Sequence, residues 1–106
     1  MNRPIPEDLA YHPEADQDAE EAEEWYGNRS EQVADQFSEA LDETECAILR
    51  DPYAYLAFTN ETRRCKVSGF PFWMIYAILP DEIFVLAVAH EKREDGYWLQ
   101  RMDNEE

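Results

Sequence analysis

FPFWMIYAILPDEIFVLAVAHEKR, residues 70–93, is the most apolar stretch of the chain and the best guide to its architecture. It holds two apolar runs, 70–79 and 83–89, and the short connection Pro80-Asp81-Glu82 lets them pair as an antiparallel hairpin. Neither run alternates apolar with polar side chains, so both faces of each strand are expected to be buried. We therefore predict that this hairpin lies at the centre of a sheet and that the rest of the chain covers and extends it.

Length and composition restrict the class of protein. The chain has 106 residues, of which 44% are hydrophobic, and this suffices for one modest core. We expect a single domain over residues 1–106, with a flexible lead-in at 1–8 and an acidic tail at 102–106. No apolar run reaches the roughly 18 residues of a membrane span, and the N-terminus lacks the pattern of a secretory signal. The sequence thus predicts a soluble, cytoplasmic protein that does not bind membranes.

The formal net charge of −16 is unevenly distributed. Residues 1–61 hold 17 acids and three bases, whereas residues 62–101 hold five acids and six bases. Such a field repels nucleic acid at long range, so contact with RNA or DNA would depend on the few bases near the hairpin. An acid-rich surface with only two lysines is also what a solubility adaptation to high salt produces, and this alternative stays open.

The residues before the hairpin predict the remaining elements. We expect a short strand at 9–12, an acidic amphipathic helix at 14–26 and a longer helix at 30–50 that Pro52 ends. A loop is expected at 53–61, and residues 62–67 alternate like a strand with one solvent-facing side.

The predicted fold class is α+β, in the order β-α-α-β-β-β, with a largely antiparallel sheet packed against an N-terminal helical hairpin and a short C-terminal helix at 97–102. The first helix has only a thin stripe of small apolar residues, so we expect it to dock through Trp25 and Tyr26.

Cys46 and Cys65 have no CxxC spacing and no histidine nearby in sequence. Two buried free thiols are the preferred interpretation, ahead of a disulfide or a metal site.

The order of these features resembles a known family, the ParE/RelE superfamily of bacterial toxins from toxin–antitoxin modules. The similarity extends over about residues 9–101, and its most specific parts resemble the ParE-type, or plasmid-stabilisation, branch. The motifs that carry it are Trp25-Tyr26, Asp51-Pro52, Arg63-Arg64, Phe70-Pro71-Phe72 with Tyr76, and His90 followed by Arg93, Tyr97-Trp98 and Arg101.

The resemblance implies a toxin that works by binding rather than by catalysis. ParE-type members poison DNA gyrase and are neutralised by a cognate antitoxin, so we expect no cofactor, no metal and a toxin–antitoxin hetero-oligomer. Because the helices are so acidic, the antitoxin segment is expected to be rich in Lys and Arg. The target-binding residues implied are Arg64, Lys66, His90, Arg93, Tyr97, Trp98 and Arg101.

Two other functions stay open. RelE-type members cleave mRNA on the ribosome, and a ribonuclease here would use Arg64, Lys66 and Tyr97 as its catalytic set. Two arginines expected of such a site are replaced by Trp73 and Glu91, and losing such a donor costs roughly 10² to 10³ in rate, so this is the runner-up. The third is a non-toxic, degenerate relative that only binds an antitoxin.

The same residues also have structural interpretations. Trp73, Tyr76 and Trp98 are aromatic side chains of the kind that fill cores, and His90 at a strand end can be a structural histidine. Arg93 and Arg101 can stack on the neighbouring aromatic rings or pair with the acidic helix.

Overall fold

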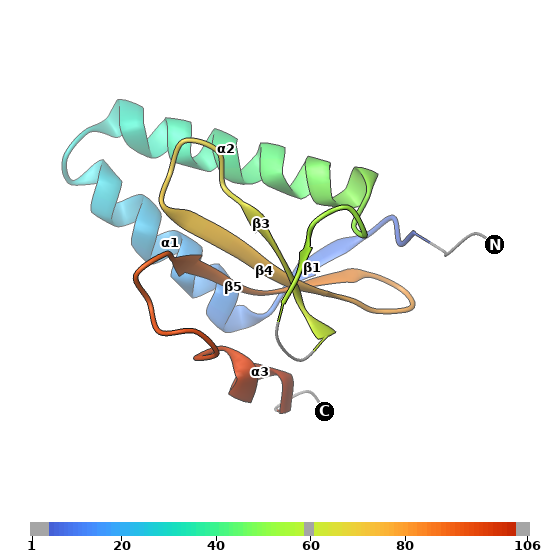
Figure 1. Cartoon of the computed structure of the whole chain (residues 1–106). Coiled ribbons are helices and arrows are strands. Elements are labelled where there is room, and N and C mark those ends of the chain that lie inside the picture. Colours follow the sequence, from blue (N-terminus) through green and yellow to red (C-terminus); the bar gives the residue numbers. More distant parts are fainter. Residues whose placement is uncertain (1–4, 59–60, 104–106) are drawn as a thin grey trace.

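The structure of the chain, a computed structural model, describes residues 5–58 and 61–103. One five-stranded sheet has the strand order β1-β5-β4-β3-β2, and its only parallel pair among the described residues is β1 with β5 (Figure 1). The predicted α+β fold with a largely antiparallel sheet is confirmed. In chain order the elements are β1 (Leu9–Tyr11), α1 (Pro13–Gly27), α2 (Glu31–Arg50), β2 (Leu56–Ala57), β3 (Arg63–Lys66), β4 (Phe72–Ile78), β5 (Ile83–His90) and α3 (Leu99–Asp103).

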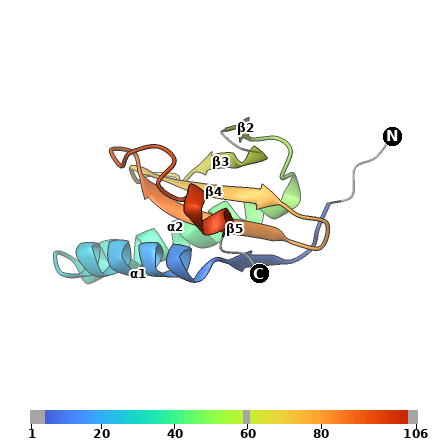
Figure 2. The ribbon, with the colours of Figure 1, turned by 90° about the horizontal axis from the view of Figure 1, so that it is seen from below.

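The hairpin of β4 and β5 is the centre of the sheet, as predicted. Its register runs from Phe72 opposite His90 to Ile78 opposite Ile83, with an irregularity beside Tyr76. Alternate side chains enter two separate apolar clusters, because Met74 and Tyr76 face the helices whereas Ile75 faces away from them. Figure 2 shows the sheet extending from β1, beside α1, to β2 at the far edge. The absence of alternation in the sequence thus reflects a sheet that is covered on both faces.

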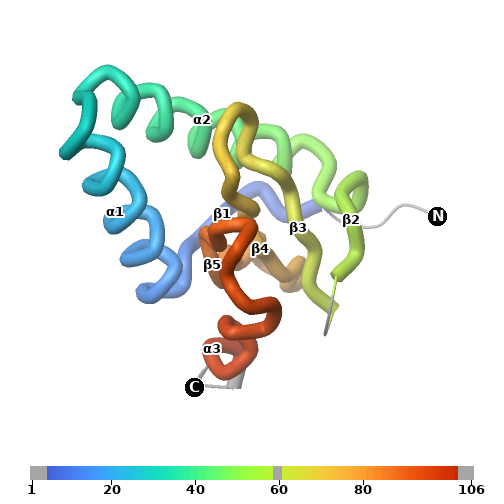
Figure 3. The backbone as a smooth tube through the Cα atoms, turned by 60° about the vertical axis from the view of Figure 1, so that its left-hand side comes forward, coloured from blue at the N-terminus to red at the C-terminus, as the bar shows by residue number. Residues whose placement is uncertain are grey.

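Two helices form a hairpin that covers one face of the sheet and opens like a V (Figure 3). Both begin at a residue whose side chain accepts a backbone N–H: His12 Nδ1 accepts from Glu14 at 3.0 Å, and Ser30 Oγ accepts from Val33 at 3.3 Å. Helix α2 buries Phe37 and four further side chains, whereas α1 buries only two alanines. The longer helix therefore supplies most of the apolar cover.

The docking prediction for α1 is half wrong. Tyr26 packs as expected, with its ring centroid 5.3 Å from that of Phe37 and 5.2 Å from that of Phe70. Trp25 does not dock, and it is 53% exposed. It lies one residue before Tyr26 on the helix, about 100° around the axis, and its ring stands beside that of Tyr26, at 5.1 Å between centroids, rather than in the core. Its ring is instead covered by the guanidinium of Arg29, at 3.6 Å.

Two further expectations need correction. The predicted loop at 53–61 contains a two-residue strand, β2, in which Leu56 lies opposite Arg64; residues 59–60 lie outside the described part. Both thiols are free, but Cys46 is exposed, because it lies on the side of α2 away from its buried stripe. Only Cys65 is buried, and burial raises the pKa of its thiol.

The C-terminal segment covers the second face of the sheet. Trp98 is 2% exposed and packs with Ile75 and Leu86, and α3 follows it directly.

In the predicted lead-in, Pro6 is buried and the carbonyl of Asp8 accepts a hydrogen bond from the Ile83 N–H; residues 1–4 lie outside the described part. Of the predicted tail, residues 102–103 belong to α3, and 104–106 lie outside the described part. Among the described residues, no helix is long and apolar enough to cross a membrane.

Candidate functional site

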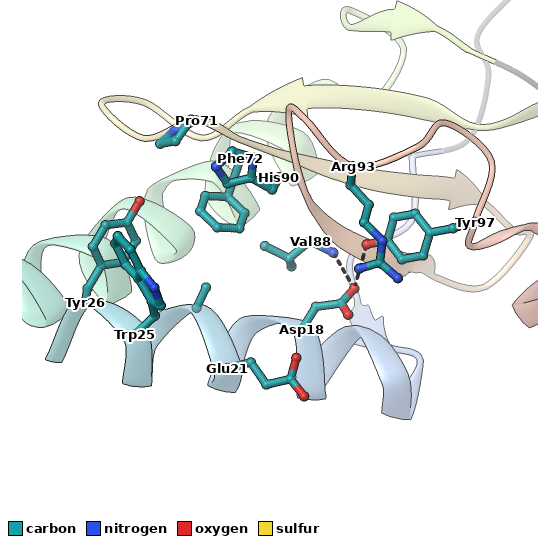
Figure 4. A pocket seen from close by; sticks show the side chains of 11 residues that line it. Asp18, Glu21, Trp25, Tyr26, Pro71, Phe72, Val88, His90, Arg93 and Tyr97 are labelled. Carbon is teal, nitrogen blue, oxygen red and sulfur yellow. Dashed lines mark hydrogen bonds between the residues drawn. The ribbon is translucent and has the colours of Figure 1, made fainter. Parts of the chain in front are cut away.

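A groove of about 580 Å³ lies between the C-terminal half of α1 and the end of β5 (Figure 4). We call it the α1–β5 groove. Its lining is mostly apolar, and charged or polar side chains stand at its rim. It is lined by Asp18, Glu21, Ala22, Trp25, Tyr26, Pro71, Phe72, Val88, His90, Arg93 and Tyr97.

The groove follows a stretch of β5 that, among the described strands, pairs with β4 on one side and with none on the other. Strand β1 pairs with β5 only as far as Val85, and no other described strand continues on that side. Two side chains form hydrogen bonds with backbone groups of β5 beyond Val85. The carboxylate of Asp18 accepts the N–H of Val88 at 3.1 Å, and Arg101 donates to the carbonyl of Leu86 at 2.7 Å. Side chains therefore satisfy part of the backbone hydrogen-bonding groups along this edge of β5, and the rest of the edge is open toward the groove.

Asp18 connects three parts of the chain. Its Oδ2 accepts hydrogen bonds from the hydroxyl of Tyr97 at 3.2 Å and from Nη1 of Arg101 at 2.9 Å, in addition to the Val88 N–H. Arg101 also forms an ion pair with Glu14, at 3.2 Å from Nε to Oε1. Burial and the charge of Asp18 raise the pKa of Tyr97 to about 12. Burial alone would lower the pKa of Arg101, but the hydrogen bond and charge of Asp18 raise it.

Three predicted site residues meet at the groove. The ring of Tyr97 lies 3.8 Å from the guanidinium carbon of Arg93, which is exposed. His90 is also exposed, its Nδ1 accepts the N–H of Lys92 at 3.1 Å, and its ring stands edge-on to Phe72 at 5.1 Å. These residues form a small cationic and aromatic rim.

Three other predicted site residues lie on the face of the sheet away from the helices: Arg64, Lys66 and Trp98. The guanidinium carbon of Arg64 lies 4.4 Å from the ring centroids of both Phe58 and Trp73. Phe58 stacks in turn on Trp98, at 5.5 Å between centroids. We call Phe58, Arg64, Trp73 and Trp98 the outer-face stack. Lys66 is exposed at its margin, with Nζ 5.9 Å from the ring of Trp73.

Two predicted contact residues are in the interior. Arg101 is 6% exposed and Trp98 is 2% exposed. The structural alternative raised for Arg101, pairing with the acidic helix, is what the structure shows. Any part these two residues take in partner binding is therefore indirect, through the C-terminal segment that they hold against the sheet.

The ribonuclease set is divided between two places. Arg64 and Lys66 belong to β3 on the outer face, whereas Tyr97 lines the groove and its hydroxyl donates a hydrogen bond to Asp18. A phenol with a raised pKa that is hydrogen-bonded to a carboxylate is poorly prepared to move a proton near neutral pH.

Asp18 is the site residue that sequence reasoning missed. It falls three residues after Ala15 and four before Ala22, on the stripe that faces the sheet. A single acid within an otherwise apolar stripe was a usable signal, because a buried carboxylate needs donors. Because the same helix carries six other acids, Asp18 does not stand out in the sequence.

Comparison with known proteins agrees with this architecture. Residues 9–95 match the family described as the ParE toxin of the type II toxin–antitoxin system, parDE. A solved structure of the chromosomal ParDE toxin–antitoxin system from P. aeruginosa is similar in fold, with a TM-score of 0.72 and 14% sequence identity over 81% of this chain and 96% of that chain. No curated protein sequence matches the chain. Because the family match covers most of its length, the chain belongs to the ParE toxin family of type II toxin–antitoxin systems.

Proposed function

We propose that this protein is a non-enzymatic toxin that inhibits a target protein such as DNA gyrase, and that a cognate antitoxin neutralises it by placing a segment in the α1–β5 groove. The observation that carries the proposal is the groove itself, which combines an apolar lining with a strand edge that no described strand pairs. Family membership supports an antitoxin partner.

The groove has the features of a peptide-binding site. Its volume of about 580 Å³ is in the range of specific ligand pockets, and Trp25 stands exposed in its wall. An exposed tryptophan beside an apolar floor is a common anchor for a partner. An extended segment can also pair its backbone with the free part of the β5 edge, which is a general mode of peptide recognition.

The charge of α1 determines what kind of segment fits. Glu21 lies at the groove, and further acids of the same helix, including Asp16, Glu20 and Glu24, surround a neighbouring shallow depression. A segment with apolar residues toward the groove and Lys or Arg toward α1 complements this surface. Its association rate should therefore fall as salt is added.

We assign the target surface to two exposed cations, Arg93 after β5 and Lys66 on β3. Arg93 is held against Tyr97 at the groove rim, and Lys66 is exposed on the outer face. Because Arg93 lines the groove, a bound antitoxin segment would cover it together with the groove. The same event would thus block part of the surface that we assign to the target.

The groove is tested by titrating the protein with the partner encoded beside it. Trp25→Ala should weaken binding at least about 10-fold, because truncated tryptophan anchors commonly cost 2 kcal/mol or more. Leu56→Ala is the matched control, since Leu56 is similarly exposed, at 59%, but lies on the far edge strand. Equal affinity for both variants, or binding that does not respond to salt, would overturn the groove assignment.

Toxicity is tested by controlled expression of the chain alone in bacteria. Wild type should arrest growth and inhibit gyrase in a supercoiling assay, and Arg93→Ala should do neither while remaining folded. Lys92→Ala, which alters an exposed neighbour outside the groove, is the control. Arg101→Ala is uninformative here because Arg101 is buried and its loss would perturb the fold. Normal growth with soluble wild-type protein present would count against an active toxin in that host.

A further inference from the structure

The outer-face stack encloses two hydrogen-bond donors that have no acceptor among the residues that the structure describes. Nε of Arg64 and Nε1 of Trp98 are both buried, and neither has a partner among the described residues. Leaving such a donor unpaired typically costs about 1–3 kcal/mol, so unpaired buried donors are rare in folded proteins. Both residues line the same cavity of about 30 Å³. Two orphan donors at one small cavity indicate a place for an acceptor.

Arg64 lies against two aromatic rings. The rings of Phe58 and Trp73 both lie 4.4 Å from its guanidinium carbon. The hydrogen-bond donors of a guanidinium lie in its plane and point outward from its edge, and the two rings offer them no acceptor. No ion pair of Arg64 occurs among the described residues. The side chain therefore resembles a preorganised fork without its oxyanion.

We propose that the cavity between Arg64 and Trp98 binds a single carboxylate, supplied by an acidic side chain of a partner protein. A carboxylate has two oxygens with about four acceptor positions, enough to receive Nε–H of Arg64, a second guanidinium N–H and the indole N–H of Trp98. A volume of about 30 Å³ holds on the order of two water molecules, and a carboxylate group can replace them while keeping their hydrogen bonds.

The local charge favours one carboxylate over a nucleic acid. Two cations, Arg64 and Arg93, and two acids, Glu91 and Asp95, line this cavity, so its charge is balanced before any ligand arrives. One added negative charge at Arg64 is acceptable there, whereas a chain of phosphates would meet both acids and the net charge of −16. The cavity is also too small to enclose a phosphodiester together with its sugars.

The carboxylate site adds to the proposed function the chemistry of the target's contact with the outer face. The identification of the partner as the toxin's target rests on the proposed function. Carboxylate binding itself is a property of the isolated chain. It can therefore be measured without growth arrest, and the two proposals can fail separately.

The test is an NMR titration of the full ¹⁵N-labelled chain with sodium acetate at pH 7. Each of the three tryptophans gives one indole N–H signal, which Trp→Phe variants assign. The Trp98 signal should move along a saturable curve with acetate and not with chloride at the same ionic strength. The signal of Trp25, which is exposed on α1, should respond alike to both salts.

Arg64→Lys keeps the charge but removes the planar fork, so saturation at Trp98 should be lost. Arg29→Lys is the matched control, because Arg29 is also stacked on a tryptophan but lies outside the cavity, and saturation should persist in it. In Trp98→Phe, the Nε–H signal of Arg64 should show an acetate response that is weaker but still saturable. The proposal is overturned if Trp98 responds identically to acetate and chloride, if Arg64→Lys still saturates, or if inorganic phosphate saturates the signal and acetate does not.

Discussion

Asp18 and Arg101, 83 residues apart in sequence, form an ion pair with 2.9 Å between Oδ2 and Nη1. The pair fastens the C-terminal segment to the first helix at the point where β1 stops pairing with β5. It lies at the end of the α1–β5 groove, where Asp18 also holds Tyr97. The geometry of the groove therefore depends on one carboxylate.

Asp18→Ala should destabilise the fold by about 3 kcal/mol. Removing one partner of a buried ion pair typically costs about 3–5 kcal/mol, and we expect the lower end because the Asp18 side chain keeps 13% exposure. Urea denaturation should show a lower midpoint with an unchanged slope. Glu20→Ala, an exposed change on the same helix, should stay within about 0.5 kcal/mol of wild type. A similar loss in both variants would mean that the hydrogen bonds of Asp18 add nothing.

Replacing Trp98 or Trp25 by alanine should lower the free energy of unfolding by different amounts, because Trp98 is in the core and Trp25 is on the surface. Trp98→Ala should cost about 3–5 kcal/mol, because it empties a buried site between the sheet and Phe58. Trp25→Ala should cost less than about 1 kcal/mol, because that side chain is 53% exposed. Thermal or chemical unfolding of the two variants compares the same chemical change in two environments. Comparable losses would show that Trp25 packs more tightly in solution than its exposure indicates.

The two thiols should differ in reactivity. Cys46 is exposed, so a disulfide reagent such as DTNB should modify it rapidly in the native protein. Cys65 is buried, and its raised pKa keeps it protonated at neutral pH, so it should react only as the protein unfolds. The native protein should therefore release about one equivalent of chromophore in the fast phase, and Cys46→Ser should remove that phase. Two fast equivalents would contradict the burial of Cys65.

The central features of the fold could be predicted because they depend on local patterns. The two apolar runs of the β4–β5 hairpin, the short connection at Pro80 and the cap at Ser30 are each visible in a few consecutive residues. Strand β2 could not be predicted, since it has two exposed residues and forms only because β3 offers an edge for pairing. The exposure of Trp25 could not be predicted, since its aromatic character favours docking and its orientation depends on the packing of its neighbours.

The site was less predictable than the fold because it is assembled from distant segments. Sequence reasoning selected cations near the C-terminus, and Arg93 does reach the groove. It gave no means of knowing that Arg101 turns inward, since that depends on an acid in α1 and a carbonyl in β5. The contacts of Arg64 are similar, because Phe58 and Trp73 meet it only through the pairing of strands. Side-chain partners across a sheet follow from register, which the sequence alone does not specify here.

The carboxyl of Glu45 should make stability depend on pH. Burial raises its pKa, and the charges of Asp42 and Asp16 raise it further, against the opposite effect of a 2.5 Å hydrogen bond from the hydroxyl of Tyr11. When a folded-state pKa lies above the unfolded one, the group's contribution to stability is fully present below the unfolded pKa, about 4.3 for Glu. That contribution is lost as the pH rises through the folded-state pKa. At pH 7 Glu45 therefore contributes less to the stability of the fold than it does in acid, and this difference is a penalty at neutral pH.

Glu45→Gln should remove this penalty, because glutamine accepts the Tyr11 hydrogen bond but does not ionise. The variant should melt at a higher temperature than wild type at pH 7, and the difference should disappear below about pH 4, where wild-type Glu45 is itself protonated. Glu43→Gln, which removes an exposed charge from the same helix, controls for the general relief of repulsion in so acidic a protein. If Glu43→Gln raises the melting temperature as much as Glu45→Gln does, net charge rather than the buried position of Glu45 is responsible. A larger gain for Glu45→Gln at pH 7 alone would identify Glu45 as the group through which mild acid stabilises the contact between β1 and α2.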